Sequence, residues 1–180
     1  NKDVYYGVWE ISAVDTVNNT VTINHLYNQD TAFPCTSPIT GGTLKVYPTV
    51  FTCTDSAEYS LFAFTTSGSI ANCLFIGNPA YFDFTGIFVN PNASVTMINC
   101  AIIDCGFTAL MSKDSYLELI NTVVSHNNYG ILSDSNGTVI ANNVTTTFNS
   151  YGMYARRNSY LRADSAIACW NSIGVQSEDN

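Results

Sequence analysis

Aromatic side chains recur at a fixed spacing in the second half of the sequence, and they are its most distinctive chemical feature. Flat apolar rings can stack on the faces of sugars, so a row of them would suit an extended glycan. The alternative is that the rings stack on one another and seal a corner of the fold, and this is the simpler interpretation for any one ring. The candidate glycan-binding residues are Tyr81, Phe82, His126, Tyr129, Phe148, Tyr151 and Trp170.

Three charged residues, Asp134, Arg156 and Glu178, follow one another at 22-residue intervals. A glycosidase needs two carboxyl groups roughly 5–9 Å apart around a sugar. Here an arginine lies between the two acids, so a ladder of alternating charge is the simpler interpretation. We therefore assign no catalytic residue.

The six cysteines do not form a metal-binding pattern, because no CxxC or Cys/His spacing occurs. We expect no metal site and no cofactor. Cys73 and Cys100 occupy equivalent positions in adjacent repeats, and we expect both to be reduced, buried and packed like small apolar residues. Cys35 and Cys53 form the one pair for which a disulfide is worth testing.

Composition and charge exclude two classes of partner. The 180 residues are 46% hydrophobic and 11% charged, with a net charge of −8 and a pI near 4.3. Because Lys and Arg are few and dispersed, nucleic-acid binding is not expected. No run of 18 apolar residues occurs, so no membrane-spanning helix is expected. The sequence also shows no initiator Met, signal peptide or terminal cap, and we expect a fragment of a longer polypeptide.

The sequence repeats every 22 residues from Val95 onward, and a fixed period of this size indicates a solenoid. Five sets of similar residues keep the same spacing through successive repeats. The sets are Asn99, Asn121, Asn143 and Ser165; Cys105, Asn127, Asn149 and Asn171; Thr108, Gly130, Gly152 and Gly174; Asn92, Asp114, Asn136, Asn158 and Asn180; and Val95, Leu117, Val139 and Leu161.

Each repeat reads as three short strands joined by tight bends, which predicts an all-β fold. Apolar residues alternate with polar ones, as at Leu117 and Leu119, and this period of two is typical of strands. Asn, Gly, Ser and Asp separate the runs, and they tolerate the left-handed backbone of tight corners. Stacked repeats would place like strands side by side in three parallel sheets, with asparagine amides bonded from turn to turn.

This pattern resembles the pectate-lyase-like class of right-handed, single-stranded parallel β-helices, through Leu119-Ile120-Asn121 and the later Gly130-Ile131. The helical segments of leucine-rich repeats and the 18-residue period of left-handed β-helices are both missing. We expect the β-helix to cover residues 43–180 and to continue beyond them. One turn carries about five extra residues, at Pro79–Asp83, and we expect a bulge there.

Residues 1–42 precede the β-helix and read as a β-hairpin cap, at 4–27, and a linker, at 28–42. The Trp-bearing strand around Trp9 alternates in polarity, and Thr20–Ile23 returns after a polar turn. This hairpin is similar to those that precede β-helices in phage tail proteins. The resemblance implies a segment of a phage tail fibre or tailspike, located on the virion, that binds a cell-surface glycan. The alternatives are a polysaccharide depolymerase, acting as a lyase or glycosidase, and a bacterial secreted adhesin located outside the cell.

An apolar stripe is expected on the outside of the strand that follows each Gly-Ile position. Alternation predicts that its members point away from the core, and an exposed apolar stripe usually marks an interface. Tail proteins that this chain resembles commonly place three chains side by side, which implies a homotrimer. The candidate interface residues are Phe88, Leu110, Leu132 and Tyr154.

Overall fold

The computed structural model describes residues 9–15, 20–25, 49–53, 60–80 and 83–178. Within these ranges all regular structure is β-strand, so the predicted all-β class is confirmed. The described part of the chain accordingly contains no helix long and apolar enough to cross a membrane. The chain divides into two compact units, residues 1–46 and 47–180.

The first unit contains the predicted hairpin. Strands β1 (Trp9–Asp15) and β2 (Thr20–His25) pair antiparallel, with Ile11 opposite Ile23. The pairing then shifts by one residue, so that Ala13 lies opposite Thr22. Such a β-bulge bends a hairpin and increases its twist.

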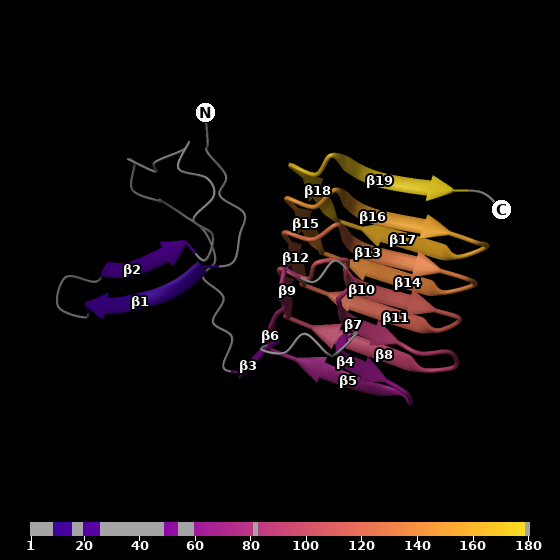
Figure 1. The fold of residues 1–180 in the computed structure, drawn as a ribbon, viewed down its shortest axis with the longest axis horizontal. Coiled ribbons are helices and arrows are strands. Elements are labelled where there is room, and N and C mark those ends of the chain that lie inside the picture. Colours follow the sequence, from indigo (N-terminus) through magenta and orange to yellow (C-terminus); the bar gives the residue numbers. More distant parts are fainter. Residues whose placement is uncertain (1–8, 16–19, 26–48, 54–59, 81–82, 179–180) are drawn as a thin grey trace. The chain divides into compact units, whose positions relative to one another are not determined.

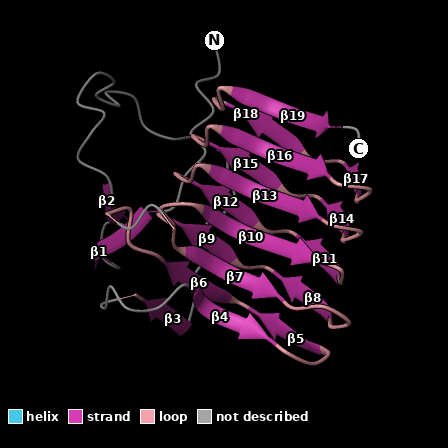
Figure 2. Ribbon diagram, turned by 45° about the vertical axis from the view of Figure 1, so that its right-hand side comes forward, coloured by secondary structure: helices cyan, strands magenta, loops and turns pink. Residues whose placement is uncertain are grey.

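The second unit is a stack of parallel strands in three sheets, as predicted (Figures 1 and 2). The chain visits the sheets in turn, so each strand pairs with its counterpart from the previous turn. The first sheet contains β3 (Thr49–Thr52), β6 (Cys73–Ile76), β9 (Ala101–Ile103), β12 (Val123–Ser125), β15 (Thr145–Thr147) and β18 (Ile167–Cys169). The second contains β4 (Ser60–Phe64), β7 (Thr85–Val89), β10 (Thr108–Lys113), β13 (Tyr129–Asp134), β16 (Tyr151–Arg156) and β19 (Ile173–Glu178). The third contains β5 (Gly68–Ala71), β8 (Ser94–Ile98), β11 (Tyr116–Ile120), β14 (Thr138–Asn142) and β17 (Tyr160–Asp164).

The 22-residue period is confirmed in the C-terminal turns of the stack, where Val124 pairs with Thr146. An earlier turn is longer, since Leu74 of β6 pairs with Ala101 of β9, 27 positions later. The five additional residues lie between β6 and β7, which is where the insertion Pro79–Asp83 was predicted.

The corner asparagines adopt the predicted left-handed backbone. Nine Asn and Asp residues at corners have φ between 47° and 67°. Their amides also bond from turn to turn, since Nδ2 of Asn121 donates to Oδ1 of Asn99 at 3.1 Å and Nδ2 of Asn143 donates to Asn121 at 2.7 Å. The nine are Asn72, Asn92, Asn99, Asp104, Asp114, Asn121, Asn136, Asn143 and Asn158.

A second asparagine ladder lies inside the stack. Asn127 and Asn149 are buried, and Oδ1 of Asn149 accepts both the backbone N–H and the side-chain amide of Asn127, at 3.0 and 2.9 Å. Asn171 accepts the same pair of bonds from Asn149, each at 2.9 Å. These bonds satisfy backbone donors that the tight corner turns inward.

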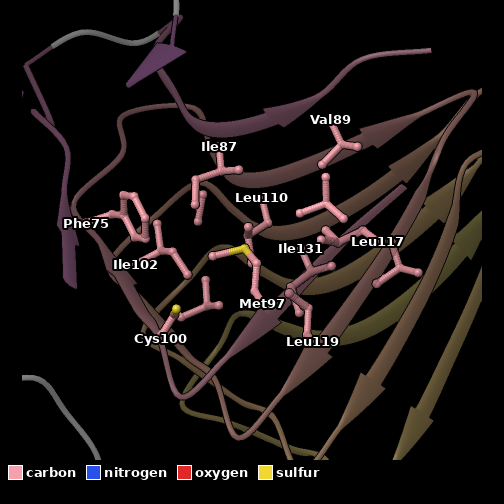
Figure 3. Close-up of a cluster of buried hydrophobic side chains, with 14 of the residues drawn as sticks. Phe75, Ile87, Val89, Met97, Cys100, Ile102, Leu110, Leu117, Leu119 and Ile131 are labelled. Carbon is pink, nitrogen blue, oxygen red and sulfur yellow. The ribbon is translucent and has the colours of Figure 1, made fainter. Parts of the chain in front are cut away.

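The core is the narrow space between the three sheets, filled by apolar side chains that repeat from turn to turn (Figure 3). Ile87 and Leu119 are fully buried there, as is Phe75, whose ring stacks on Phe51 at 5.1 Å between ring centroids. Burial of a large apolar side chain stabilises the fold by about 1.5–3 kcal/mol. Cys73 and Cys100 are buried free thiols in this core, as predicted.

Strand β10 is shifted by one residue from the sequence repeat, which corrects one prediction. Leu110 pairs with Ile87 and Ile131, so it occupies the inward position and is fully buried in the core (Figure 3). Thr108 likewise pairs with Tyr129 and not with Gly130. The corner before β10 is one residue longer than its successors and the corner after it is one shorter. The prediction that Leu110 points outward is therefore wrong, and Met111 takes that position.

Candidate functional site

One column of aromatic rings runs along the corner between the first and second sheets. His126, Phe148 and Trp170 each follow a strand of the first sheet. The His126 and Phe148 ring centroids are 5.1 Å apart with an interplanar angle of 20°, and those of Phe148 and Trp170 are 5.2 Å apart at 17°. The rings therefore stack on one another face to face, which is the simpler of the two sequence interpretations.

These three rings have an unusual backbone. Their φ angles are 59°, 54° and 51°, in the left-handed region that asparagine and aspartate occupy at other corners. For bulky residues this conformation costs on the order of 1–2 kcal/mol. It persists only where the surroundings enforce it, and such positions cluster at functional sites. The rung spacing and the ring stacking hold the side chains there, so the column is a fixed, preorganised surface.

A second aromatic column lies on the other side of the same corner. Phe107 and Tyr129 meet edge to face at 5.3 Å, whereas Tyr129 and Tyr151 stack in parallel at 4.9 Å. The ring of Tyr154, three residues after Tyr151 on β16, stacks on Tyr129 and Tyr151 at 5.6 and 5.5 Å. The sequence missed Tyr154 as a member of this cluster because spacing alone does not show that neighbouring columns touch.

The two columns give the corner a surface of ring edges with polar backbone between them. Trp170 is 54% exposed, and Tyr129 and Tyr151 are half-buried. A ligand along this corner would meet aromatic edges and tyrosine hydroxyls, because stacking within each column occupies the ring faces. Tyr81 and Phe82, the other two predicted glycan-binding residues, lie outside the described residues.

A charge ladder crosses the outer face of the second sheet. Lys113, Asp134, Arg156 and Glu178 are register partners on adjacent strands. The buried Asp134 carboxylate accepts a hydrogen bond from Arg156 Nη2 at 3.0 Å and pairs with Arg157 at 3.4 Å. Burial lowers the pKa of the Arg156 guanidinium, but the hydrogen bond and charge of Asp134 outweigh it, so that pKa lies above its ordinary value. The predicted Asp134–Arg156 pairing is therefore confirmed.

Glu178 takes part differently, because it accepts a hydrogen bond from the Tyr154 hydroxyl. This bond, together with burial, raises the pKa of Tyr154 above its ordinary value. Lys113 was not found from the sequence, since the shift of β10 places it 21 and not 22 positions before Asp134.

The predicted apolar interface stripe is only partly present. Leu110 lies in the core, so Phe88, Met111, Leu132 and Tyr154 form the outward column. Leu132 is fully buried and Tyr154 is 6% exposed within the single chain. Only the half-buried Phe88 and Met111 remain accessible in this column.

A shallow groove of about 250 Å³ lies at these two accessible residues. It lies at the N-terminal end of the second sheet, along β4, β7 and β10, beside the predicted insertion. Its lining combines two aromatic rings, a thioether, two hydroxyls and a carboxylate: Ser60, Asp83, Thr85, Phe88, Phe107 and Met111. Sequence spacing could not assemble this set, because it depends on the shift of β10.

Among the residues that the structure describes, no group of three or more His, Cys, Asp or Glu side chains could hold a metal ion. The thiols of Cys73 and Cys100 bond back to the carbonyls two residues before them, at 3.2 and 3.4 Å, as the Thr122 hydroxyl does in the next turn. Their role is therefore to close the bend. The Cys35–Cys53 pairing stays a prediction, since Cys35 lies outside the described residues.

Comparison with known proteins defines the family. No curated protein and no solved structure matches the chain significantly. A family model described as a right-handed beta helix region matches residues 59–180, which include every strand from β4 to β19. This match covers about two thirds of the chain, and the described turns have the parallel three-sheet arrangement that it implies. The chain therefore belongs to the right-handed β-helix family.

Proposed function

We propose that this chain is a segment of a phage tail fibre or tailspike, located on the virion, that supports attachment to a host-surface glycan. The observation that carries the proposal is the aromatic corner formed by His126, Phe148 and Trp170. Three bulky rings occupy left-handed corner positions, where glycine would avoid the steric cost. A binding surface explains why such rings are placed at a solvent-facing corner.

The solenoid suits this role mechanically. Each described turn pairs with the turns on either side through the parallel sheets, so the surface of the stack repeats at the rung spacing of about 4.8 Å. A glycan chain is also a repeating polymer. Successive sugars along the corner could therefore meet successive rings and tyrosine hydroxyls.

The proposed assembly is a homotrimer, on the basis of the resemblance to tail proteins. Sedimentation equilibrium of the purified chain measures its stoichiometry directly. A monomer at high micromolar concentration would contradict the trimer without affecting the glycan proposal.

The glycan proposal is tested by incubating the purified chain with capsular polysaccharide and lipopolysaccharide from candidate host bacteria. Retention of the protein, without shortening of the polysaccharide, is the expected result. Shortened products would instead favour the depolymerase alternative. Neither retention nor cleavage, across the hosts tested, would contradict both.

Substitution at the corner localises the binding. Trp170→Ala removes an exposed ring with little loss of core packing, and we expect about tenfold weaker retention. Tyr160→Ala is the matched control, because Tyr160 is equally exposed on the third sheet. Equal losses in both variants would contradict a site at the aromatic corner.

A further inference from the structure

The groove at the lower end of the second sheet has the chemistry of a site for a single sugar ring. Its lining is mixed, with the rings of Phe88 and Phe107 and the Met111 thioether beside the hydroxyls of Ser60 and Thr85. A pyranose has the same division, with apolar C–H faces and a rim of hydroxyls. Sites for small molecules are typically apolar with a few polar groups that fix orientation.

The strand register builds this lining from three separate stretches of the chain, at residues 60, 83–88 and 107–111. Phe88 and Met111 are paired neighbours on β7 and β10, and Ser60 and Thr85 are paired neighbours on β4 and β7. The backbone N–H groups of Phe107 and Thr108 both donate to the carbonyl of Phe84, at 3.0 and 3.3 Å. These bonds anchor the lengthened corner that carries the Phe107 ring to the groove.

The ring geometry of the second aromatic column, formed by Phe107, Tyr129 and Tyr151, changes beside the groove. Tyr129 and Tyr151 stack in parallel, but Phe107 meets Tyr129 at an interplanar angle of 74°. The parallel stacking that occupies ring faces in the upper turns therefore ends at Phe107. An aromatic surface beside a hollow is better suited to a sugar face than the ring edges along the corner.

Charge restricts which sugar can enter. Asp83 is the one ionisable side chain among the described lining residues, and it is exposed. Its carboxylate can accept hydrogen bonds from sugar hydroxyls but would repel an acidic sugar. The chain as a whole, with a net charge of −8, would also disfavour an anionic polymer.

We propose that this groove binds one uncharged pyranose unit of the glycan, with Phe88 and Phe107 as the stacking surface and Asp83 as the hydrogen-bond acceptor. The proposal rests on the glycan-binding function proposed above and adds the class of sugar and its position. The groove volume of about 250 Å³ is below the roughly 300–1,000 Å³ of sites for larger ligands. It therefore fits one ring and not an oligosaccharide.

The test uses the 180-residue chain and saturation-transfer NMR, which detects weak binding. The probes are methyl glycosides of glucose, galactose, mannose, rhamnose and N-acetylglucosamine, with methyl glucuronide as the anionic comparison. We expect saturation of at least one neutral probe and none of the glucuronide. Binding of the glucuronide in preference to every neutral probe would overturn the proposal.

Two variants locate the binding in the groove. Phe107→Ala should weaken binding of the neutral probe about tenfold, and Asp83→Lys should weaken it and permit binding of methyl glucuronide. Tyr160→Ala and Asp164→Asn are the matched aromatic and acidic controls on the third sheet, and both should bind as the unchanged chain does. Melting temperatures confirm that each variant folds.

The outcomes separate this inference from the function on which it rests. Neutral-probe binding that survives both groove variants would overturn the groove site and leave glycan attachment standing. Retention on host polysaccharide without binding of any monosaccharide probe would do the same. Failure of the unchanged chain to bind polysaccharide or probe would overturn both proposals.

Discussion

The corner asparagines act in two different ways that their spacing does not distinguish. Asn121 and Asn143 lie in the solvent-facing ladder, where water can replace a lost amide bond. Asn149 lies inside the stack, where its Oδ1 accepts two bonds from Asn127 and its Nδ2 donates to the Val124 carbonyl at 3.3 Å. Removal of an interior amide leaves buried donors unpaired, whereas removal of an outer amide does not.

Substitution of the interior asparagine should therefore cost more stability than substitution of the outer one. We expect Asn149→Ala to lower the free energy of unfolding by about 2–4 kcal/mol, and Asn143→Ala by about 1 kcal/mol. Urea denaturation followed by circular dichroism measures both. Equal losses would show that the interior ladder is not the more important one.

The buried thiol of Cys105 should make the free energy of unfolding fall as the pH rises into the alkaline range. Burial raises the pKa of Cys105 far above its ordinary value, so the folded chain keeps this thiol protonated while the unfolded chain ionises it. The pKa of this thiol is about 8.5 in the unfolded chain. Below that pH the thiol is protonated in both states and the free energy of unfolding is unaffected, and above it ionisation of the unfolded chain lowers the free energy of unfolding.

The expected slope from one such thiol is about 1.4 kcal/mol per pH unit above pH 8.5. Cys105→Ala should reduce the loss of unfolding free energy between pH 8.5 and 10 by this amount per unit. Denaturation curves at a series of pH values provide the comparison. An unchanged slope would mean that Cys105 ionises in the folded chain.

At the scale of strands, the sequence predicts the elements well and one register poorly. The alternation around Leu117 and Leu119 and the Gly-Ile positions predict three strands in each turn, because period and bend residues are local properties. The shift of β10 is not local. The corner before β10 has one residue more than the equivalent corner of the next turn, and the corner after it has one residue fewer. The spacing from β9 to β12 and from β11 to β14 therefore stays at 22 residues, and counting along the sequence cannot detect the shift.

The shift has a direct test in two adjacent residues. Leu110→Ala should lower the free energy of unfolding by about 2–5 kcal/mol because it leaves a cavity in the core. Met111→Ala should cost less than about 1 kcal/mol, since Met111 is half-buried on the outer face. Thermal or urea denaturation measures both changes. A larger loss at Met111 than at Leu110 would support the unshifted register.

Close backbone approach explains why glycine is the second residue of some strands of the second sheet. A Cβ added at Gly152 would lie 2.5 Å from the Gly174 carbonyl oxygen and 2.7 Å from Thr146 Oγ1, whereas at Gly174 its nearest contact would be an ordinary 3.6 Å. The turn that contains Gly174 lies directly against Gly152 at the spacing of paired strands. A methyl group at Gly152 therefore cannot be accommodated unless the backbone shifts.

Gly152→Ala should therefore lower the free energy of unfolding by about 1–3 kcal/mol. Gly174→Ala is the matched control, and we expect it to be neutral within about 0.5 kcal/mol. Urea denaturation measures both. A neutral Gly152→Ala would show that the turns can separate at this corner.

At the scale of the whole molecule, the repeat fixes the fold because each turn rests on its neighbours in the same way. The candidate site is less predictable. The aromatic columns follow from spacing, but the groove requires Ser60, Asp83 and Phe107 to meet from three irregular turns, where the period is broken. The lining of the groove therefore lies where the repeat is broken, and the 22-residue spacing does not predict it.

The corner before β10 is one residue longer and the corner after it one residue shorter than in the next turn. This compensation suggests how the loops of a β-helix can change without a change of the fold. A residue gained between β9 and β10 and lost between β10 and β11 leaves every turn above in phase, so a change in one loop does not rotate the rest of the stack. New loop sequences can then be exchanged at one level while the levels above and below keep their geometry. Grafting of foreign loops between β9 and β10 should, for the same reason, alter the surface of that corner without re-engineering the scaffold.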